Sequence, residues 1–234
     1  MAIIDLAAHR PRAARSQVPA RRMFASAALL LVSAALQFIA SLERWVTITE
    51  SWTRTDHLVE DHRFDYLYPS DPWEPLGSTA HLAGAGFPLM GLAVLVMVVG
   101  TAVDRVLAIA VALSFAIPGI HALVSGLIGV PTPAQHVVAW LTLVSFIGLV
   151  VLAVRTIRTS WVTSLAFVLL SAITITGYIV VAFVITPTIT NFQSFDTTPW
   201  TETIVAAFIA LAGLAMLAAA GAVLLKNPPT RPLA

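Results

Sequence analysis

The sequence predicts an all-α membrane protein, a polytopic bundle of six transmembrane helices with both termini in the cytoplasm. Three observations predict this class: the composition, the length of the apolar runs and the placement of the basic residues. Of the 234 residues, 58% are hydrophobic and only 11% are charged, whereas a soluble domain usually carries about 25% charged residues. The mean hydropathy of +0.88 also favours a membrane protein.

Six apolar runs are each long enough to cross a bilayer, for which about 20 residues suffice. Backbone that faces lipid must satisfy its hydrogen bonds within its own segment, so these runs are expected to be helices. Together they leave no room for a separate soluble domain. The runs cover residues 23–42, 79–101, 106–129, 137–154, 161–185 and 203–225, each approximately.

The basic residues are concentrated on one side of these runs. Ten of the thirteen precede the first run, follow the sixth, or lie in the short connections after runs two and four: Arg10, Arg12, Arg15, Arg21, Arg22, Arg105, Arg155, Arg158, Lys226 and Arg231. The positive-inside rule places that side in the cytoplasm. The sequence therefore predicts a multi-pass protein of the plasma (inner) membrane. It has a basic cytoplasmic arm at 1–22, a membrane domain at 23–225 and a cytoplasmic tail at 226–234.

The longest extracytoplasmic loop, residues 43–78, is rich in acidic and aromatic side chains. This composition predicts a folded cap over the bundle or a docking surface for a partner. His57, Asp61 and Asp65 recur every four residues and would share one face of a helix, where they could hold a divalent cation. Their spacing matches no known calcium loop. A solvated acidic face is the alternative, and no metal is assigned.

Polar residues in runs one, three and five recur at helical spacing. In run one, for example, Ser33 and Gln37 are four residues apart, as His121 and Ser125 are in run three. These faces either line one interior or form hydrogen bonds across dry helix interfaces. Run two instead carries glycines, including Gly84, and such small residues allow close helix packing. The candidate ligand-binding residues are His121, Ser125, Ser114, Gln37, Tyr178, His136 and His81.

His121 is the most unusual polar residue in the apolar part of the chain, because Pro118 and Gly119 lie within three residues of it. Proline removes one backbone hydrogen bond and bends a helix, which would leave His121 facing a polar pocket. Three interpretations stay open. His121 is a hydrogen-bonding residue between helices, a ligand-binding or proton-handling residue, or a metal ligand together with His81 or His136.

Several classes of function are disfavoured by what the sequence lacks. No acidic or basic residue is expected within a run, although ion-coupled transporters usually need one there. The chain contains no cysteine, which excludes thiol catalysis and thiolate metal sites. It contains no P-loop, HExxH or nucleophile motif. No basic, aromatic patch indicates nucleic acid, and no cofactor is assigned.

Residues 84–158 resemble part of a widespread group of six-helix bacterial membrane proteins known only as a domain of unknown function. The resemblance rests on the short turn that ends in Arg105, the segment "GLIGVPTP" and the helix start "QHVVAW". It implies the six-helix fold and no chemistry.

The function expected from these features is non-enzymatic binding. The cap or an outward-facing pocket would bind a small ligand or a membrane-protein partner at the extracytoplasmic face. The lipid bilayer would surround the helices. Two alternatives stay open: a small transporter for an uncharged or weakly basic solute, and a membrane-embedded enzyme that uses His121.

Overall fold

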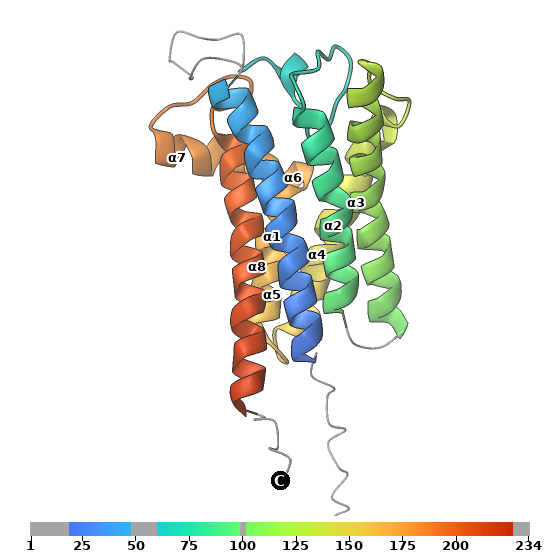
Figure 1. Ribbon diagram of the computed structural model, residues 1–234, viewed down its shortest axis with the longest axis vertical. Helices are drawn as coiled ribbons and strands as arrows, with labels where there is room; N and C mark the ends of the chain where they lie inside the picture. The colour runs from blue at the N-terminus through green and yellow to red at the C-terminus, as the bar shows by residue number, and fades with distance from the viewer. Residues whose placement is uncertain (1–18, 48–59, 99–101, 227–234) are drawn as a thin grey trace, which may run out of the picture.

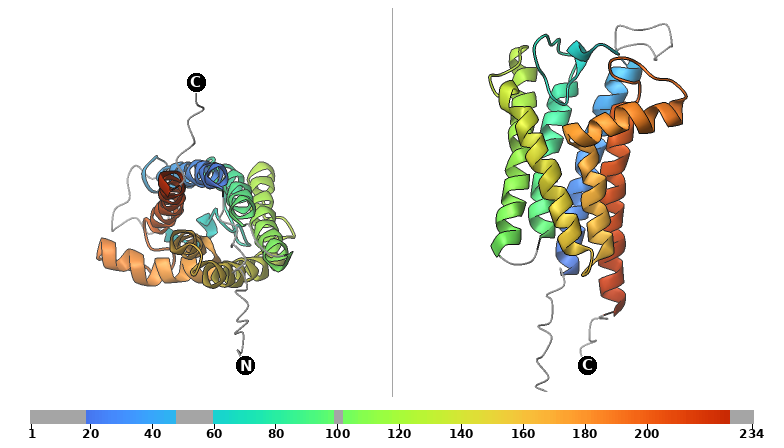
Figure 2. Two further views of the ribbon diagram at one scale, coloured as in Figure 1. Left: turned by 90° about the horizontal axis from the view of Figure 1, so that it is seen from below. Right: turned by 180° about the vertical axis from the view of Figure 1, so that it is seen from behind.

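The structure is a computed structural model that describes residues 19–47, 60–98 and 102–226. Within these residues all regular structure is helical. Six long segments stand side by side in a ring, seen end-on in Figure 2. Each packs against the next in chain order, and the last packs against the first. The predicted all-α class is therefore confirmed within these residues.

Five of the six segments are single helices long and apolar enough to cross a membrane. Their bounds agree with the predicted runs to within a few residues, apart from a five-residue extension of the first. They are α1 (Ala20–Leu42), which continues into a π-helical turn at Glu43–Thr47, α2 (Thr79–Met97), α3 (Ala102–Ile128), α4 (Gln135–Thr156) and α8 (Thr201–Lys226).

The segment between α4 and α8 differs from the prediction of one straight span at 161–185. It begins as α5 (Trp161–Leu170) and a 3-10 turn, Ser171–Ile173, and then breaks at Thr174. The chain turns by 79° into a second limb, Ile175–Thr190. This limb comprises α6 (Ile175–Val180), a π-helical turn and α7 (Thr186–Thr190). Figures 1 and 2 show it running sideways out of the ring.

Local chemistry explains the break. Thr174 has extended backbone angles, and its hydroxyl accepts a hydrogen bond from the Gly177 N–H, which makes it the N-cap of the second limb. Gly177 lies so close to the preceding turn that an added Cβ would sit 1.9 Å from the Ser171 carbonyl oxygen. A helix-spaced apolar pattern continues through both limbs, so the sequence pattern did not reveal the turn.

The two ends of the ring differ in chemistry. One end of the ring, at the bottom of Figure 1, holds the starts of α1 and α3 and the end of α8. We call it the basic end, because five arginines lie at helix ends there or in the turn after α4: Arg21, Arg22, Arg105, Arg155 and Arg158. The opposite end carries residues 60–78, and we call it the cap end. The clustering of basic residues at one end of the bundle agrees with their predicted placement on one side of the apolar runs.

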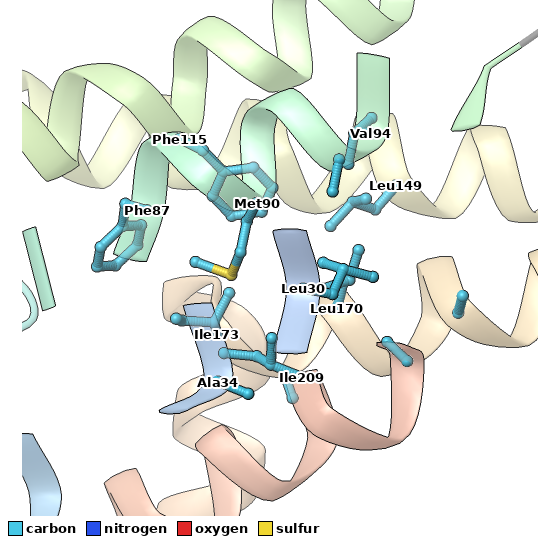
Figure 3. Packing of buried hydrophobic residues seen from close by; sticks show 14 of the residues in the cluster. Leu30, Ala34, Phe87, Met90, Val94, Phe115, Leu149, Leu170, Ile173 and Ile209 are labelled. Atoms are coloured by element: carbon cyan, nitrogen blue, oxygen red, sulfur yellow. The ribbon is translucent and has the colours of Figure 1, made fainter. Parts of the chain in front are cut away.

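The centre of the ring is filled by apolar side chains from every long segment. Figure 3 shows them converging from α1, α2, α3, α4, α5 and α8. Its labelled residues are Leu30, Ala34, Phe87, Met90, Val94, Phe115, Leu149, Leu170, Ile173 and Ile209, all buried. Close packing of this kind leaves few voids larger than a water molecule.

Glycines bring α2 and α3 into contact, as the glycine pattern of run two predicted. A Cβ added at Gly84 would lie 2.7 Å from the Gly119 carbonyl oxygen. A Cβ at Gly119 would lie equally close to the Gly84 oxygen. Gly119 therefore serves helix packing, and α3 runs through Pro118 as one helix.

Candidate functional site

The cap, residues 60–76, is fixed in the mouth of the ring. Tyr66, Leu67 and Trp73 are buried and belong to the hydrophobic core. The Tyr68 hydroxyl donates a hydrogen bond to the carbonyl oxygen of Ile173, in the turn before the break of the fifth segment. The cap thus provides a hydrogen-bond donor for backbone at the point where the helix ends. The folded cap expected from the sequence is present in residues 60–76, and residues 48–59 lie outside the described part of the chain.

Arg44 lies at the centre of the cap end and is fully buried. It stands in the π-helical turn that extends α1. Its Nη1 donates to a carboxylate oxygen of Glu202 at 2.7 Å and to one of Asp65 at 2.9 Å. One guanidinium therefore joins three separate parts of the chain: the end of α1, the start of α8 and the cap. A buried charge requires such partners, because an unpaired one is costly.

Further hydrogen-bond donors replace the water that both carboxylates lose on burial. Glu202 is 3% exposed and accepts from Trp45 Nε1 at 2.8 Å and from the Tyr178 hydroxyl at 3.3 Å. Asp65 accepts from the Thr197 hydroxyl at 2.8 Å and from His62 Nδ1 at 2.9 Å. Tyr178 stands on the second limb of the fifth segment, so this cluster also anchors that limb. We call Arg44, Asp65, Glu202 and these donors the Arg44 cluster.

The cluster reaches solvent through His62 and Asp65. Burial by itself would raise the pKa of Asp65, but the hydrogen bond from His62 and the charge of Arg44 outweigh it and hold that pKa below its ordinary value. The hydrogen bond to Asp65 in turn raises the pKa of His62, against the opposing effect of burial. The buried guanidinium of Arg44 therefore faces an Asp65 carboxyl whose lowered pKa keeps it ionised near neutral pH.

The helix that contains run one extends beyond its predicted end at residue 42. The first helix long and apolar enough to cross a membrane runs from Ala20 to Thr47 and contains Arg44, and Glu202 is in the first turn of the last. Because the predicted run one ends at residue 42, the sequence pattern places Arg44 in a loop. The missed signal is "ERWV", in which apolar Trp45 and Val46 continue the run beyond the charge.

His121, the leading candidate of the sequence analysis, also connects α3 with the cap. Its side chain is buried, and Nε2 lies 2.7 Å from the Pro69 carbonyl oxygen. Nδ1 lies 2.7 Å from the Thr132 hydroxyl in the α3–α4 connection and 3.4 Å from the Ser125 hydroxyl. A carbonyl can only accept, so Nε2 carries the proton and Nδ1 accepts from a hydroxyl. Both ring nitrogens are engaged, which agrees with the interpretation of His121 as a hydrogen-bonding residue between helices.

Apart from Ser125, the other candidate residues do not gather around His121. Gln37 donates to the Ala83 carbonyl oxygen at 3.1 Å, between α1 and α2. Ser114 and the Ser145 hydroxyl are 2.7 Å apart, between α3 and α4. His136 is exposed at the start of α4, whereas the ring of His81 packs beside Gly126. Gln37 of run one and Ser114 of run three therefore face neighbouring helices and not one shared space.

A shallow apolar pocket of about 190 Å³ lies beside His121 on the outer surface of the ring. Its lining comprises Ile117, Ile120, His121, Val124, Thr132 and Ala134. Ile120 is 55% exposed, so the pocket opens sideways toward the lipid-facing surface. Both ring nitrogens of His121 already have hydrogen-bond partners, so the pocket offers mainly apolar contact.

Metal binding finds no support in the described part of the chain. There, no group of three or more His, Asp or Glu side chains is arranged to hold a metal ion. His57 lies outside the described residues, and Asp65 is engaged by Arg44 and His62. The proposed cation site at His57, Asp61 and Asp65 therefore remains a hypothesis from spacing.

No protein-family model matches this chain, and neither a curated protein sequence nor a solved structure matches it significantly.

Proposed function

We propose that the chain is a non-enzymatic binding protein of the plasma membrane, in which the rigid cap is an extracytoplasmic docking surface for a partner protein. The positive-inside rule supports this orientation, because it assigns the basic end to the cytoplasm and the cap to the outside. The observation that carries the proposal is the Arg44 cluster, which ties the cap to α1 and α8 through a fully buried guanidinium.

Rigidity is what a docking surface needs, because a surface ordered before binding loses less entropy when the partner arrives. The cap is held at three places: Asp65 binds Arg44, Pro69 binds His121 and Tyr68 binds the end of α5. A transport path at this end would require all three sets of contacts to break. The apolar centre of the ring supports the same conclusion.

The chemistry of the cap favours a partner with a basic surface. Its exposed charged side chains are mainly acidic: Glu74 is 58% exposed and Asp61 47%. Asp71 is exposed too, and Asp196 in the connection before α8 is 51% exposed. Arg63, which pairs with Asp61 and Glu74 at 3.4 Å, is the basic residue among the described cap positions. Complementary charge of this kind speeds and orients association.

Site-specific photocrosslinking in native membranes tests this proposal. A photoreactive residue replaces Ser70, which is exposed on the cap, or Val106, which is 68% exposed at the basic end. We expect a discrete protein adduct from position 70 and none of the same size from position 106. Glu74→Gln and Asp71→Asn together should weaken that adduct, and added salt should weaken it further, because exposed charges are screened. An adduct at both positions, or one insensitive to charge, would count against a specific acidic docking surface.

A further inference from the structure

A groove at the basic end combines two arginines with an apolar lining. It has a volume of about 250 Å³ and lies where α1, α2 and α3 meet. Its lining comprises Arg22, Leu95, Val98, Arg105, Ala108 and Ile109. Arg22 comes from the first turn of α1 and Arg105 from the first turn of α3, so two helices that are not neighbours in sequence each contribute one cation.

Neither arginine is neutralised within the described residues. Both side chains are exposed, and no ion pair joins either of them to a carboxylate there. The nearest acidic residue in sequence, Asp104, accepts instead from Arg155 Nε at 2.5 Å. In the described part of the chain, the groove therefore presents two guanidinium groups that are not ion-paired with a carboxylate. Guanidinium donors match phosphate oxygens in geometry and charge.

The remaining lining is apolar and continues onto the surface that faces lipid. Leu95 is 36% exposed and lies two residues before the end of α2, and Ile109 is 49% exposed and lies four residues beyond Arg105 on α3. A ligand that fits this arrangement has a negative phosphate at the membrane surface and an apolar chain directed into the hydrocarbon. An inorganic anion would satisfy the arginines and leave the apolar lining without a partner.

We propose that this groove is a binding site for one anionic phospholipid, whose phosphate headgroup lies between Arg22 and Arg105 and whose acyl chain lies against Leu95 and Ile109. The site is independent of the docking function proposed for the cap, because it lies at the opposite end of the bundle. It also explains two arginines that would otherwise serve only to set orientation.

Native mass spectrometry of the purified, delipidated full chain in neutral detergent tests the site. The probes are phosphatidylglycerol and phosphatidylcholine with identical acyl chains, and inorganic phosphate as competitor. Each basic residue near an anionic membrane surface raises the binding affinity about fivefold. We therefore expect the first phosphatidylglycerol to bind on the order of 25-fold more tightly than phosphatidylcholine, and millimolar phosphate not to displace it.

Matched variants assign the effect to the groove. Arg22→Gln and Arg105→Gln should each reduce the preference for phosphatidylglycerol about fivefold. Arg21→Gln is the control, because Arg21 is exposed one residue away and does not line the groove. Arg22→Lys, which keeps the charge, should retain part of the preference, and circular dichroism checks that each variant is folded. An equal loss with Arg21→Gln, equal binding of the two lipids, or displacement by phosphate would overturn the proposal.

Discussion

At the scale of single residues, the cap end is organised by side chains that each hold several segments together. Arg44 binds α8 through Glu202 and the cap through Asp65. His121 binds the cap through Pro69. In both cases a buried polar group is fully engaged, which is the condition under which burial of such groups is tolerated.

Removing Arg44 should destabilise the protein far more than removing the partly exposed Arg63. Arg44→Gln leaves Glu202 buried without its cation, and breaking a buried pair in this way costs about 3–5 kcal/mol. Arg63→Gln removes ion pairs at the surface, which are worth less than about 1 kcal/mol. Both variants are compared by equilibrium unfolding in detergent. Equal losses would mean that the Arg44 cluster does not stabilise the fold.

The His62–Asp65 pair should make the cap sensitive to pH. The pKa of His62 in the folded protein is raised, so its contribution is fully present below its ordinary value of 6.5 and is lost as pH rises through the higher folded value. The pKa of Asp65 is lowered, so its contribution is present above 3.8 and is lost as pH falls through the lower folded value. The pair therefore contributes most between about pH 4 and 6.5.

Hydrogen exchange of residues 60–76 measures this dependence. After correction for the intrinsic exchange rate, protection should fall between pH 6 and pH 8.5. His62→Asn should remove the pH dependence and leave the buried contacts of Arg44 intact. A cap whose protection is constant over this range in the unaltered protein would refute the role of His62.

At the scale of the elements, the broken fifth segment departs most from a simple bundle. The first limb packs against α4 and α8 within the ring. The second limb leaves the ring after the 79° turn and exposes apolar residues, among them Phe183 and Val184. Tyr178 and Tyr68 bond this region to the cap end, because Tyr178 binds Glu202 and Tyr68 binds Ile173. Exposed apolar surface of this kind at a membrane-protein periphery is compatible with contact to the lipid interface.

Gly177→Ala should disrupt this turn. Its Cβ would meet the Ser171 carbonyl oxygen at 1.9 Å, and backbone atoms there cannot move aside without opening the bend. Overpacking costs typically about 1–3 kcal/mol. Gly221→Ala in α8 is the control, since nothing lies within 4 Å of its added Cβ.

Thermal unfolding in detergent should show a lowered midpoint for Gly177→Ala and little change for Gly221→Ala. Spin labels on α5 and α7 report the angle between the limbs. A Gly177→Ala protein with normal stability and an unchanged angle would show that the turn does not depend on this glycine.

At the scale of the whole molecule, the ring is closed by packing between its first and last helices, and polar groups are shared between neighbours. Ser33 donates to the Gly86 carbonyl oxygen at 2.9 Å, and Ser114 pairs with Ser145. Interhelical bonds of this type contribute about 0.6 kcal/mol each on average in a membrane protein. Their distribution around the ring supports a rigid binding protein over a transporter that opens to both sides.

Cysteine accessibility distinguishes these two functions. The chain has no cysteine of its own, so Ser33→Cys, Ser114→Cys and Ser70→Cys each introduce a single, clean target. A membrane-impermeant maleimide should label position 70 only from the extracytoplasmic side and leave the two buried positions unlabelled from either side. Labelling of position 114 from both sides would support alternating access and contradict the proposed function. Labelling of position 70 from the cytoplasmic side would reverse the assigned orientation.

The sequence by itself determined the class of protein, the approximate bounds of five spanning helices and the placement of basic residues at one end. These features depend on composition and on runs of about 20 apolar residues, which the bilayer requires whatever the neighbours are. The sequence also singled out His121 and, through its glycines, the close approach of α2 to α3. Each of these signals is local or is imposed by the membrane.

Only the tertiary structure decided which polar groups meet. Arg44 and Glu202 are 158 residues apart, and the sequence around each residue does not indicate the other as its partner. The turn after Ile173 likewise depends on Thr174, on Gly177 and on a tyrosine from the cap, whereas the apolar pattern continues unbroken through it. Hydrophobic patterning shows which surface avoids water. Which buried charges pair, and which donor binds a free backbone carbonyl, depends on contacts between segments distant in the chain.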